Sequence, residues 1–357
     1  GYVEVGKTPI TLRDVEPGLL EYTLLRNDCQ LYDGRLWIEP GKEHVERVRM
    51  KPGRVFFVDQ NHPMASDTNP GSEGKPWATI PKAAAVLKAG DTVLVKEGVY
   101  EGPERASFKS GGEFNPANSG EPGRPIVFRA YPGHKVVIKG YPRKATFLIT
   151  RRRHIVLDGF RVEGHRVGAI NSEHVIIRNI ELVRGEPEAI THPNNLHWGL
   201  ILYEAKDCRL ENNYVHDMIH PAQPPQHNNA CIMLFAGTES CVIQNNEADA
   251  GRDSGRGVCN AFGQKGGHIF GNIWRRNIAR NATCGFLGMA ATACDESSGD
   301  NIYYCNLCIN CENAFELNHM CYGFRIFNNT VWNCQRFLTA GHGCEHNRLW
   351  NNLVVVE

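Results

Sequence analysis

The chain has 357 residues, and its 39 Lys and Arg are balanced by 39 Asp and Glu. A zero formal charge gives no electrostatic basis for binding along nucleic acid, and no stretch is long and apolar enough to span a membrane. The sequence starts with GYVEV, without Met or a signal peptide, and stops inside a repeat at Val356-Glu357, so we expect a processed or trimmed piece of a longer protein.

The first 53 residues carry no repeat. Short alternating runs such as YTLLR and RLWIEP, separated by Gly and Pro, predict short strands. We therefore expect residues 1–53 to form a small β-rich cap or docking segment, separate in organisation from residues 54–357.

Residues 54–100 predict a strand, a short helix and a second strand. The helix is expected at 78–89, with Thr79 near the N-cap, Pro81 in the first turn and Gly90 beyond the end. Its apolar face would cover the open end of a stacked β structure, where backbone groups and core are otherwise exposed. That face consists of Ile80, Ala84 and Leu87.

A ten-residue unit, CRLENNYVHD at 208–217, recurs through the remaining chain. Clear copies are CVIQNNEADA at 241–250, FRIFNNTVWN at 324–333 and NRLWNNLVVV at 347–356, and looser copies begin at His154, His174 and Asn301. Copies follow one another every 20 to 33 residues, which is typical of a stacked solenoid. The apolar runs are too short for helices, and the LxxLxLxxN pattern of leucine-rich repeats is absent. The sequence predicts a parallel β-coil.

Equivalent residues of successive coils should stack in ladders about 4.8 Å apart. One inward ladder is expected from Leu210, Ile243, Ile326 and Leu349, and a second from Val215, Ala248, Val331 and Val354. The Asn pairs would lie where the chain bends, because Asn tolerates left-handed backbone torsions. Stacked Asn side chains can also bond to one another along the axis. We interpret these Asn as architecture.

The 13 cysteines include a CxxCxxC motif at Cys305, Cys308 and Cys311. Such spacing is found in metal and cluster sites, but Cys208 and Cys241 fall at one repeat position, as buried stacked thiols would. Some disulfides remain an alternative. We expect no metal at Cys305, Cys308 and Cys311, because the sequence singles out no fourth ligand.

A resemblance to a known family lies in residues 54–140. The segment FFVD…SDTNPGSEGKPWATIPKAAAVLKAGDTVLVKEGVYEG, with PIVFRAYPGHKVVIKG at 125–140, resembles the opening of pectate-lyase-like right-handed parallel β-helix proteins. The resemblance implies an all-β fold: a right-handed parallel β-helix solenoid with a short N-terminal capping helix and a small N-terminal β segment. The superfamily contains polysaccharide lyases, glycoside hydrolases, uronate epimerases and phage tail spikes, and it implies a secreted, periplasmic or cell-surface location.

Three long polar segments, at 101–124, 184–198 and 216–229, are expected to project as loops. The last two leave successive coils at the same place, so they would line one side of a groove. The strands that follow would form its floor, at 199–204, 230–235, 257–265, 285–290, 314–320 and 337–343.

The densest charged segment is 249–265, which suits β-elimination on a uronic acid. A cation, or calcium held by Asp249 and Asp253, would neutralise the uronate carboxylate. Lys265 would then remove the C5 proton, with Arg256 and Asp253 beside it. Lys265 resembles, in position, the base lysine of some alginate and chondroitin lyases. Those enzymes place an Arg in the next coil's equivalent strand, where this chain has GFLGMA.

Two rival functions stay open. A glycoside hydrolase would use two carboxylates, and the candidates are Glu204, Asp253 and Glu316 with Asp217 or Asp249. A non-catalytic glycan-binding or structural β-helix would use aromatic platforms for sugar stacking. The further candidates for substrate contact are Trp198, Tyr203, Phe235, His220, His227 and His342, and His319 is a catalytic candidate expected to stack on His342.

We therefore expect a polysaccharide lyase that acts on an acidic polysaccharide, with calcium as the one cofactor considered. The expected partner is the polysaccharide itself and not a nucleic acid. The sequence leaves the oligomeric state open.

Overall fold

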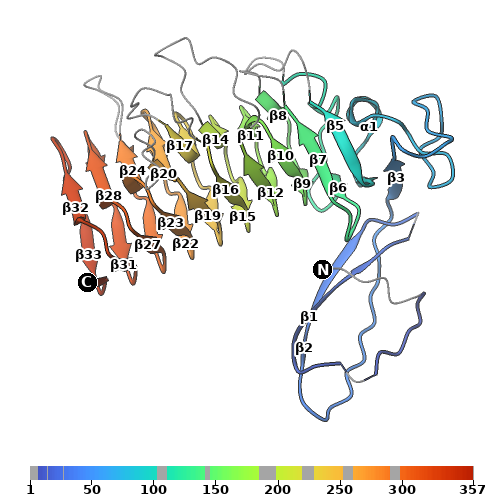
Figure 1. The fold of residues 1–357 in the computed structure, drawn as a ribbon, viewed down its shortest axis with the longest axis horizontal. Coiled ribbons are helices and arrows are strands. Elements are labelled where there is room, and N and C mark those ends of the chain that lie inside the picture. Colours follow the sequence, from blue (N-terminus) through green and yellow to red (C-terminus); the bar gives the residue numbers. More distant parts are fainter. Residues whose placement is uncertain are drawn as a thin grey trace.

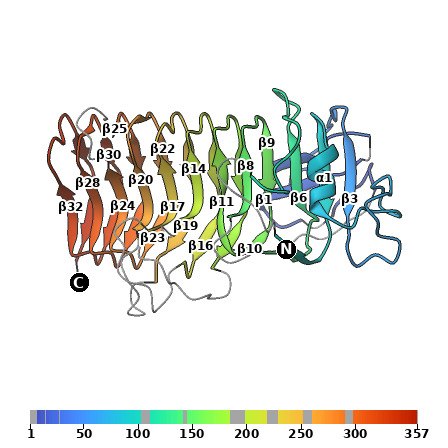
Figure 2. The same ribbon diagram turned by 90° about the horizontal axis from the view of Figure 1, so that it is seen from above.

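The computed structural model describes residues 7–13, 15–26, 28–102, 111–140, 145–184, 198–218, 229–251, 260–289 and 298–356. These residues are mostly β-strands, stacked coil upon coil along one axis, and they include one short helix (Figures 1 and 2). The chain adopts the all-β parallel solenoid that the repeat predicted.

Three long parallel sheets, counted over the described residues, run along the solenoid. The eleven-stranded sheet holds β3 (Arg54–Val58), β4 (Asp91–Val95), β6 (Ile126–Ala130), β9 (Ile155–Asp158), β12 (Ile176–Arg178), β15 (Arg209–Glu211), β18 (Val242–Gln244), β22 (Ile273–Arg275), β26 (Ile302–Tyr304), β30 (Arg325–Phe327) and β33 (Arg348–Trp350). The ten-stranded sheet holds β5 (Gly98–Glu101), β7 (Val136–Lys139), β10 (Arg161–Glu163), β13 (Glu181–Val183), β16 (Tyr214–His216), β19 (Glu247–Asp249), β23 (Ile278–Arg280), β27 (Leu307–Ile309), β31 (Thr330–Trp332) and β34 (Leu353–Val355).

The eight-stranded sheet completes each coil. It holds β8 (Ala145–Thr150), β11 (His165–Ile170), β14 (Trp198–Tyr203), β17 (Ala230–Phe235), β20 (Asn260–Lys265), β24 (Cys284–Met289), β28 (Asn313–Asn318) and β32 (Arg336–Ala340). A short sheet of β21 (Ile269–Phe270), β25 (Ser298–Gly299) and β29 (Cys321–Tyr322) lies in the turns between the eight-stranded and eleven-stranded sheets.

The predicted apolar ladders are present. Leu210 pairs with Ile243, and Ile326 pairs with Leu349. Between these two pairs the ladder continues through Trp274 and Tyr303, which pair with Ile243 and Ile326 respectively and are fully buried. Leu210, Ile243 and Ile326 have no exposed surface, and Leu349 packs partly buried against the same core. The register read from the repeat is therefore confirmed, and large aromatic residues fill the middle coils.

The second ladder runs in register from Val215 through Ala248 to Val331 and Val354, by way of Ala279 and Cys308. Val354 is 44% exposed, because it lies in the last described coil and has a neighbour on one side only.

A ladder of asparagines joins the corners between the eleven-stranded and ten-stranded sheets. The side-chain amide of Asn246 donates to Asn277 Oδ1 at 3.0 Å, and Asn277 donates to Asn306 at 3.0 Å. Each Oδ1 also accepts a main-chain N–H from the preceding coil. The residue before each ladder Asn has a positive φ, as at Asn212 (55°) and Asn245 (54°). The amide stacking and the bend predicted for the Asn pairs are both confirmed.

A second polar ladder joins the corners after the eight-stranded sheet. The sequence predicted its stacked thiols, Cys208 and Cys241, but not its continuation into asparagines. The Cys208 N–H donates to Cys241 Sγ at 3.4 Å, and the Cys241 N–H donates to Asn272 Oδ1 at 2.9 Å. Asn272 then donates to Asn301 at 3.0 Å. Thiols in the earlier coils and amides in the later coils therefore occupy one structural position, where each accepts a main-chain N–H from the preceding coil.

The capping helix α1 (Ile80–Val86) is shorter than the predicted range of 78–89. The Thr79 side chain accepts from the Lys82 N–H, and Asp67 accepts from the Ala78 and Thr79 N–H groups, so the first turn is doubly capped. Ile80, Ala84 and Leu87 are buried, as expected for a cap over the core. In the part of the chain that the structure describes, no helix is long and apolar enough to cross a membrane.

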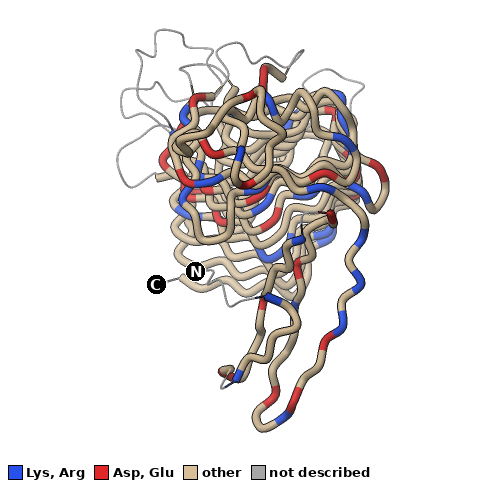
Figure 3. Tube along the Cα trace, turned by 90° about the vertical axis from the view of Figure 1, so that its right-hand side faces the viewer, with Lys and Arg blue, Asp and Glu red and all other residues tan. Residues whose placement is uncertain are grey.

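Before the solenoid, β1 (Gly18–Leu24) and β2 (Tyr32–Ile38) form an antiparallel hairpin. Seen along the solenoid axis, the N-terminal segment projects from the stacked coils (Figure 3). Positive and negative residues are interspersed over the tube, in keeping with the balanced charge. The hairpin lies against the early strands of the eleven-stranded sheet, through contacts described below.

Candidate functional site

The outer face of the eight-stranded sheet carries most of the described candidate residues. Its side chains come in register, so that Tyr203, Phe235, Lys265, Met289 and Asn318 form one row. A parallel row contains Ile201, Met233, Gly263, Leu287, Glu316 and Thr339. We use the name outer face for the side of the eight-stranded sheet that carries these two rows, together with the first residues of its strands.

The outer face changes character along the solenoid. Its early coils carry an apolar cluster, distinct from the solenoid core, of Ala145, Leu148, Ile170, Trp198, Ile201, Ala230 and Met233, with Tyr203 and Phe235 packed against it. The ring of Phe235 lies 4.9 Å from that of Trp198 and 5.3 Å from that of Tyr203. Trp198 is only 6% exposed, so Tyr203 and Phe235 are the more accessible rings for a sugar.

Only four charged residues occur in the eight strands of this sheet, counted over the described residues: Arg166, Lys265, Glu316 and Arg336. Three of the four are cations. Arg166 and Arg336 lie three strands to either side of the Lys265 strand, which is about 14 Å at the usual strand spacing. The described strands of this sheet therefore carry more positive than negative charge, although Arg336 also pairs with Glu312 at 3.4 Å outside the sheet.

Lys265 lies at the end of β20, between Phe235 and Met289 on the neighbouring strands. It is half-buried, and burial lowers the pKa of its amine below the ordinary lysine value. A lowered pKa increases the neutral fraction of an amine, which is the form that can accept a proton. The next strand has Met289 at this position and no arginine, as the sequence indicated.

Glu316 lies two strands beyond Lys265, held by its neighbours. Asn313 and Asn318 donate to its two carboxylate oxygens at 3.2 and 3.4 Å. Asn313 Oδ1 in turn accepts from Thr339 at 3.0 Å and from Arg336 at 3.4 Å. These contacts fix the carboxylate as part of a polar cluster on the later coils.

The sequence singled out neither Arg166 nor Arg336. The guanidinium of Arg166 lies 5.6 Å from the Trp198 ring centre, and burial lowers its pKa. Arg336 occupies the same place in its coil as Asn313. The signal that could have found both is the strand register, since each lies in a strand of the outer face.

Other predicted residues lie elsewhere or outside the described residues. His319 and His342 lie in corresponding turns after β28 and β32, where the Met320 N–H donates to the His342 carbonyl. Glu204 lies in the turn after β14 with a positive φ. Outside the described residues are Asp253, Arg256, His220 and His227, with most of the two loops that were expected to line a groove.

Asp249 does not lie on the outer face. It belongs to β19 of the ten-stranded sheet, and its carboxylate accepts from the Gly251 N–H at 2.9 Å and from Asn281 Nδ2 at 3.0 Å. Within the described ranges, the sole group of three or more potential metal ligands is a set of cysteines. Asp253, the other expected calcium ligand, lies outside the described residues, so calcium binding at Asp249 stays a prediction.

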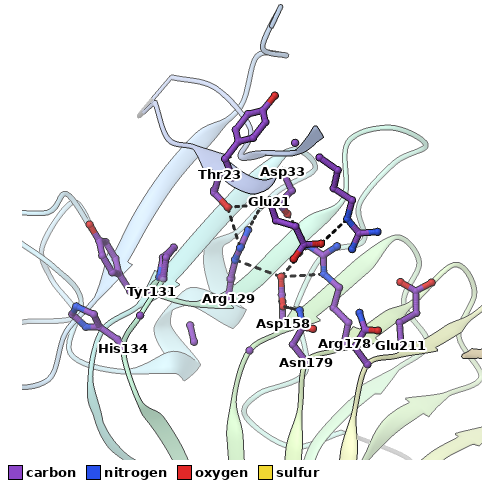
Figure 4. A pocket seen from close by; sticks show the side chains of 18 residues that line it. Glu21, Thr23, Asp33, Arg129, Tyr131, His134, Asp158, Arg178, Asn179 and Glu211 are labelled. Carbon is purple, nitrogen blue, oxygen red and sulfur yellow. Dashed lines mark hydrogen bonds and ion pairs between the residues drawn. The ribbon is translucent and has the colours of Figure 1, made fainter. Parts of the chain in front are cut away.

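A separate cavity of about 640 Å³ lies between the hairpin and the solenoid (Figure 4). Its floor is a network of paired charges, in which Arg129 contacts Asp33 at 2.7 Å and Asp158 at 3.4 Å. Arg178 contacts the same two carboxylates at 2.9 Å each. These pairs join residues far apart in sequence, so the network holds the hairpin against the solenoid.

Replacing Asp33 by Asn should loosen the hairpin. Burial alone would raise the pKa of Asp33, but Arg129, Thr23 and Arg178 together outweigh it and hold the pKa below the ordinary value. A depressed carboxyl pKa stabilises docking above the unfolded pKa of about 3.9, and this stabilisation is lost as the pH falls through the folded pKa. We expect lower protection factors, that is, amide exchange corrected for the intrinsic rate at each pH, in β1 and β2 of Asp33→Asn at neutral pH and of the wild type in acid.

Glu21→Gln is the matched control, because Glu21 pairs with the exposed Arg35 inside the hairpin and not with the solenoid. Its exchange should equal that of the wild type. Equal exchange in Asp33→Asn and Glu21→Gln would show that the charge network does not anchor the hairpin.

The fold relates the chain to solved structures. Pectate lyase Pel9A superposes with a TM-score of 0.58 at 15% identity, covering 84% of this chain and 78% of that one. The family 28 exopolygalacturonase of Yersinia enterocolitica superposes with a TM-score of 0.52 at 10% identity, covering 91% and 72%. The chain has the pectate-lyase-like parallel β-helix fold. At these identities the likeness concerns the fold alone.

Sequence comparison covers less of the chain. No protein-family model matches it. The uncharacterized protein YwoF of Bacillus subtilis (strain 168) is 36% identical over 88 residues, which are 25% of this chain and 16% of that protein. The match therefore spans a small part of the length of that relative.

Proposed function

We propose that this protein is a polysaccharide lyase that cleaves a uronate-containing polysaccharide on the outer face of the eight-stranded sheet. The observation that carries the proposal is Lys265, a half-buried lysine with a lowered pKa in the middle of a sheet whose few charges are mostly positive. The β-helix fold is shared with a pectate lyase and an exopolygalacturonase, and this likeness adds support for action on a polysaccharide.

The chemistry follows from the residues on that face. Tyr203 and Phe235 would bind a sugar ring through its apolar side. Arg166 or Arg336 would pair with uronate carboxylates along the chain. The neutral amine of Lys265 would take the C5 proton, the electron pair would form the C4–C5 double bond, and the glycosidic oxygen would leave and become protonated.

Hydrolysis by two carboxylates has less support. Such enzymes need two carboxyl groups within about 5–9.5 Å of each other. Glu316 is the one carboxylate in the described strands of the outer face, and its oxygens already accept from two asparagines. Asp217, one proposed partner, pairs with His216 at 2.8 Å on the ten-stranded side.

Product analysis tests the proposal. The protein is incubated with polymers of galacturonate, of mannuronate and guluronate, and of glucuronate. We expect an unsaturated, ultraviolet-absorbing uronate end from one of these classes. New reducing ends without that absorbance would mean hydrolysis, and saturable binding without any cleavage would mean a glycan-binding β-helix. Each of these two results contradicts the lyase.

A secreted, periplasmic or cell-surface location, where such polymers occur, is part of the proposal.

A further inference from the structure

Three buried cysteines converge where two late coils meet. Cys308 lies on β27, Cys311 lies in the corner that follows it, and Cys334 lies in the equivalent corner one coil later. Their three Sγ atoms lie within 4.8 Å of one another, and the residues are 1%, 2% and 8% exposed. From the sequence we expected no metal at Cys305, Cys308 and Cys311. The structure leaves Cys305 exposed, with a positive φ at the Asn corner, and brings Cys334 to the other two instead.

Coil stacking explains two of the three positions. The Cys311 N–H donates to Cys334 Sγ at 3.4 Å, just as the Cys208 N–H donates to Cys241 Sγ at 3.4 Å in earlier coils. The earlier pair meets no third thiol within the described residues. Stacking alone therefore accounts for a pair of thiols, and Cys308 is an additional sulfur brought in from the strand.

The place of Cys308 depends on a glycine in the neighbouring coil. A Cβ at Gly285 would collide with Cys308 Sγ, so the absence of a side chain there leaves room for the sulfur. The sulfur points inward among core residues. The core therefore has room for the Cys308 thiol beside the stacked pair of Cys311 and Cys334, away from solvent.

The geometry of the cluster suits a coordinated ion. Three sulfur atoms within 4.8 Å of one another, on residues that are almost fully buried, offer an ion soft ligands in a place that excludes water.

We propose that Cys308, Cys311 and Cys334 form a three-sulfur site for a soft, thiophilic metal ion, with Cu(I) as the first candidate. Sulfur-only ligand sets select soft ions. Structural zinc is normally held by four ligands, and the described residues supply no fourth, whereas Cu(I) accepts three-coordinate sites. On binding, the thiols that ligate the ion release their protons to solvent. This inference is independent of the proposed lyase activity.

Anaerobic titration of the fully reduced protein with Cu(I), in competition with the chromophoric chelator bicinchoninate, tests the site. We expect one tightly held equivalent in the wild type. Cys334→Ser should weaken that binding by at least about 100-fold. Cys305→Ser and Cys241→Ser, which remove an exposed thiol and a stacked thiol outside the cluster, should bind as the wild type does.

X-ray absorption of the Cu(I)-loaded wild type gives a readout that needs no variant, should Cys334→Ser fail to fold. We expect three sulfur neighbours and no nitrogen or oxygen at the ion. The proposal is wrong if the reduced wild type withdraws no Cu(I) from the chelator. It is equally wrong if the folded Cys334→Ser protein binds with unchanged affinity, or if the ion has other than three sulfurs.

Discussion

Lys265→Ala should lower turnover of the uronate polysaccharide by about 10²–10⁴-fold, the usual cost of removing a general base. Its thermal stability should change little, roughly 1 kcal/mol or less, because the side chain is only half-buried at the sheet surface. In the wild type, activity should rise with pH as the Lys265 amine loses its proton. Because burial lowers the pKa of Lys265, this rise should occur below the pH at which an ordinary lysine titrates.

Lys265→Arg tests whether residue 265 acts as a base or only supplies a positive charge, because arginine keeps the charge but stays protonated over the pH range of the assay. It should be as inactive as Lys265→Ala. Lys206→Ala is the matched control, because Lys206 is an exposed turn lysine paired with Glu239, and it should keep full activity. If Lys265→Ala stays active while Glu316→Gln loses activity, the lyase assignment fails and hydrolysis takes its place.

Asn277→Ala should be among the most damaging single changes to the solenoid, costing roughly 3 kcal/mol or more in the free energy of unfolding. Asn277 Oδ1 accepts from both the main-chain N–H and the side chain of Asn246 at 3.0 Å. Its Nδ2 donates to the Ile243 carbonyl at 2.9 Å and to Asn306 at 3.0 Å. Alanine would leave several of these buried groups unpaired.

Denaturant unfolding followed by circular dichroism measures this loss. The control is Asn245→Gly, an exposed corner residue with a φ of 54° that glycine adopts freely. It should change the free energy of unfolding by about 0.5 kcal/mol or less. A loss in Asn277→Ala no larger than in Asn245→Gly would show that the amide ladder does not hold the coils together.

The solenoid could be predicted because its determinants repeat locally. Leu210 and Ile243 occupy the same position before their Asn corners, and this shared position set the register of the strands. The stacking of the two side chains then followed from the spacing between strands. Trp274 and Tyr303 replace aliphatic residues in this ladder, so the repeat copies of the middle coils were harder to align from the sequence. The Asn272–Asn301 ladder has thiols in its earlier coils, which hid its period.

Contacts between distant segments could not be predicted in this way. The Asp33–Arg129 pair spans 96 residues, and Cys334 reaches the Cys308–Cys311 cluster from the next coil. The strand alternation correctly placed Glu316 and Asn318 on one outward face. It could not show that Asp249 and Lys265, close in sequence, belong to different sheets.

The most direct test of the central claim is the product formed from a uronate polymer and from the same polymer with its carboxyl groups reduced to alcohols. Elimination needs the carboxylate, because it acidifies the C5 proton that Lys265 is proposed to remove. The account predicts unsaturated ends from the uronate polymer and no cleavage of the reduced polymer. Saturated reducing ends released from both polymers would contradict it.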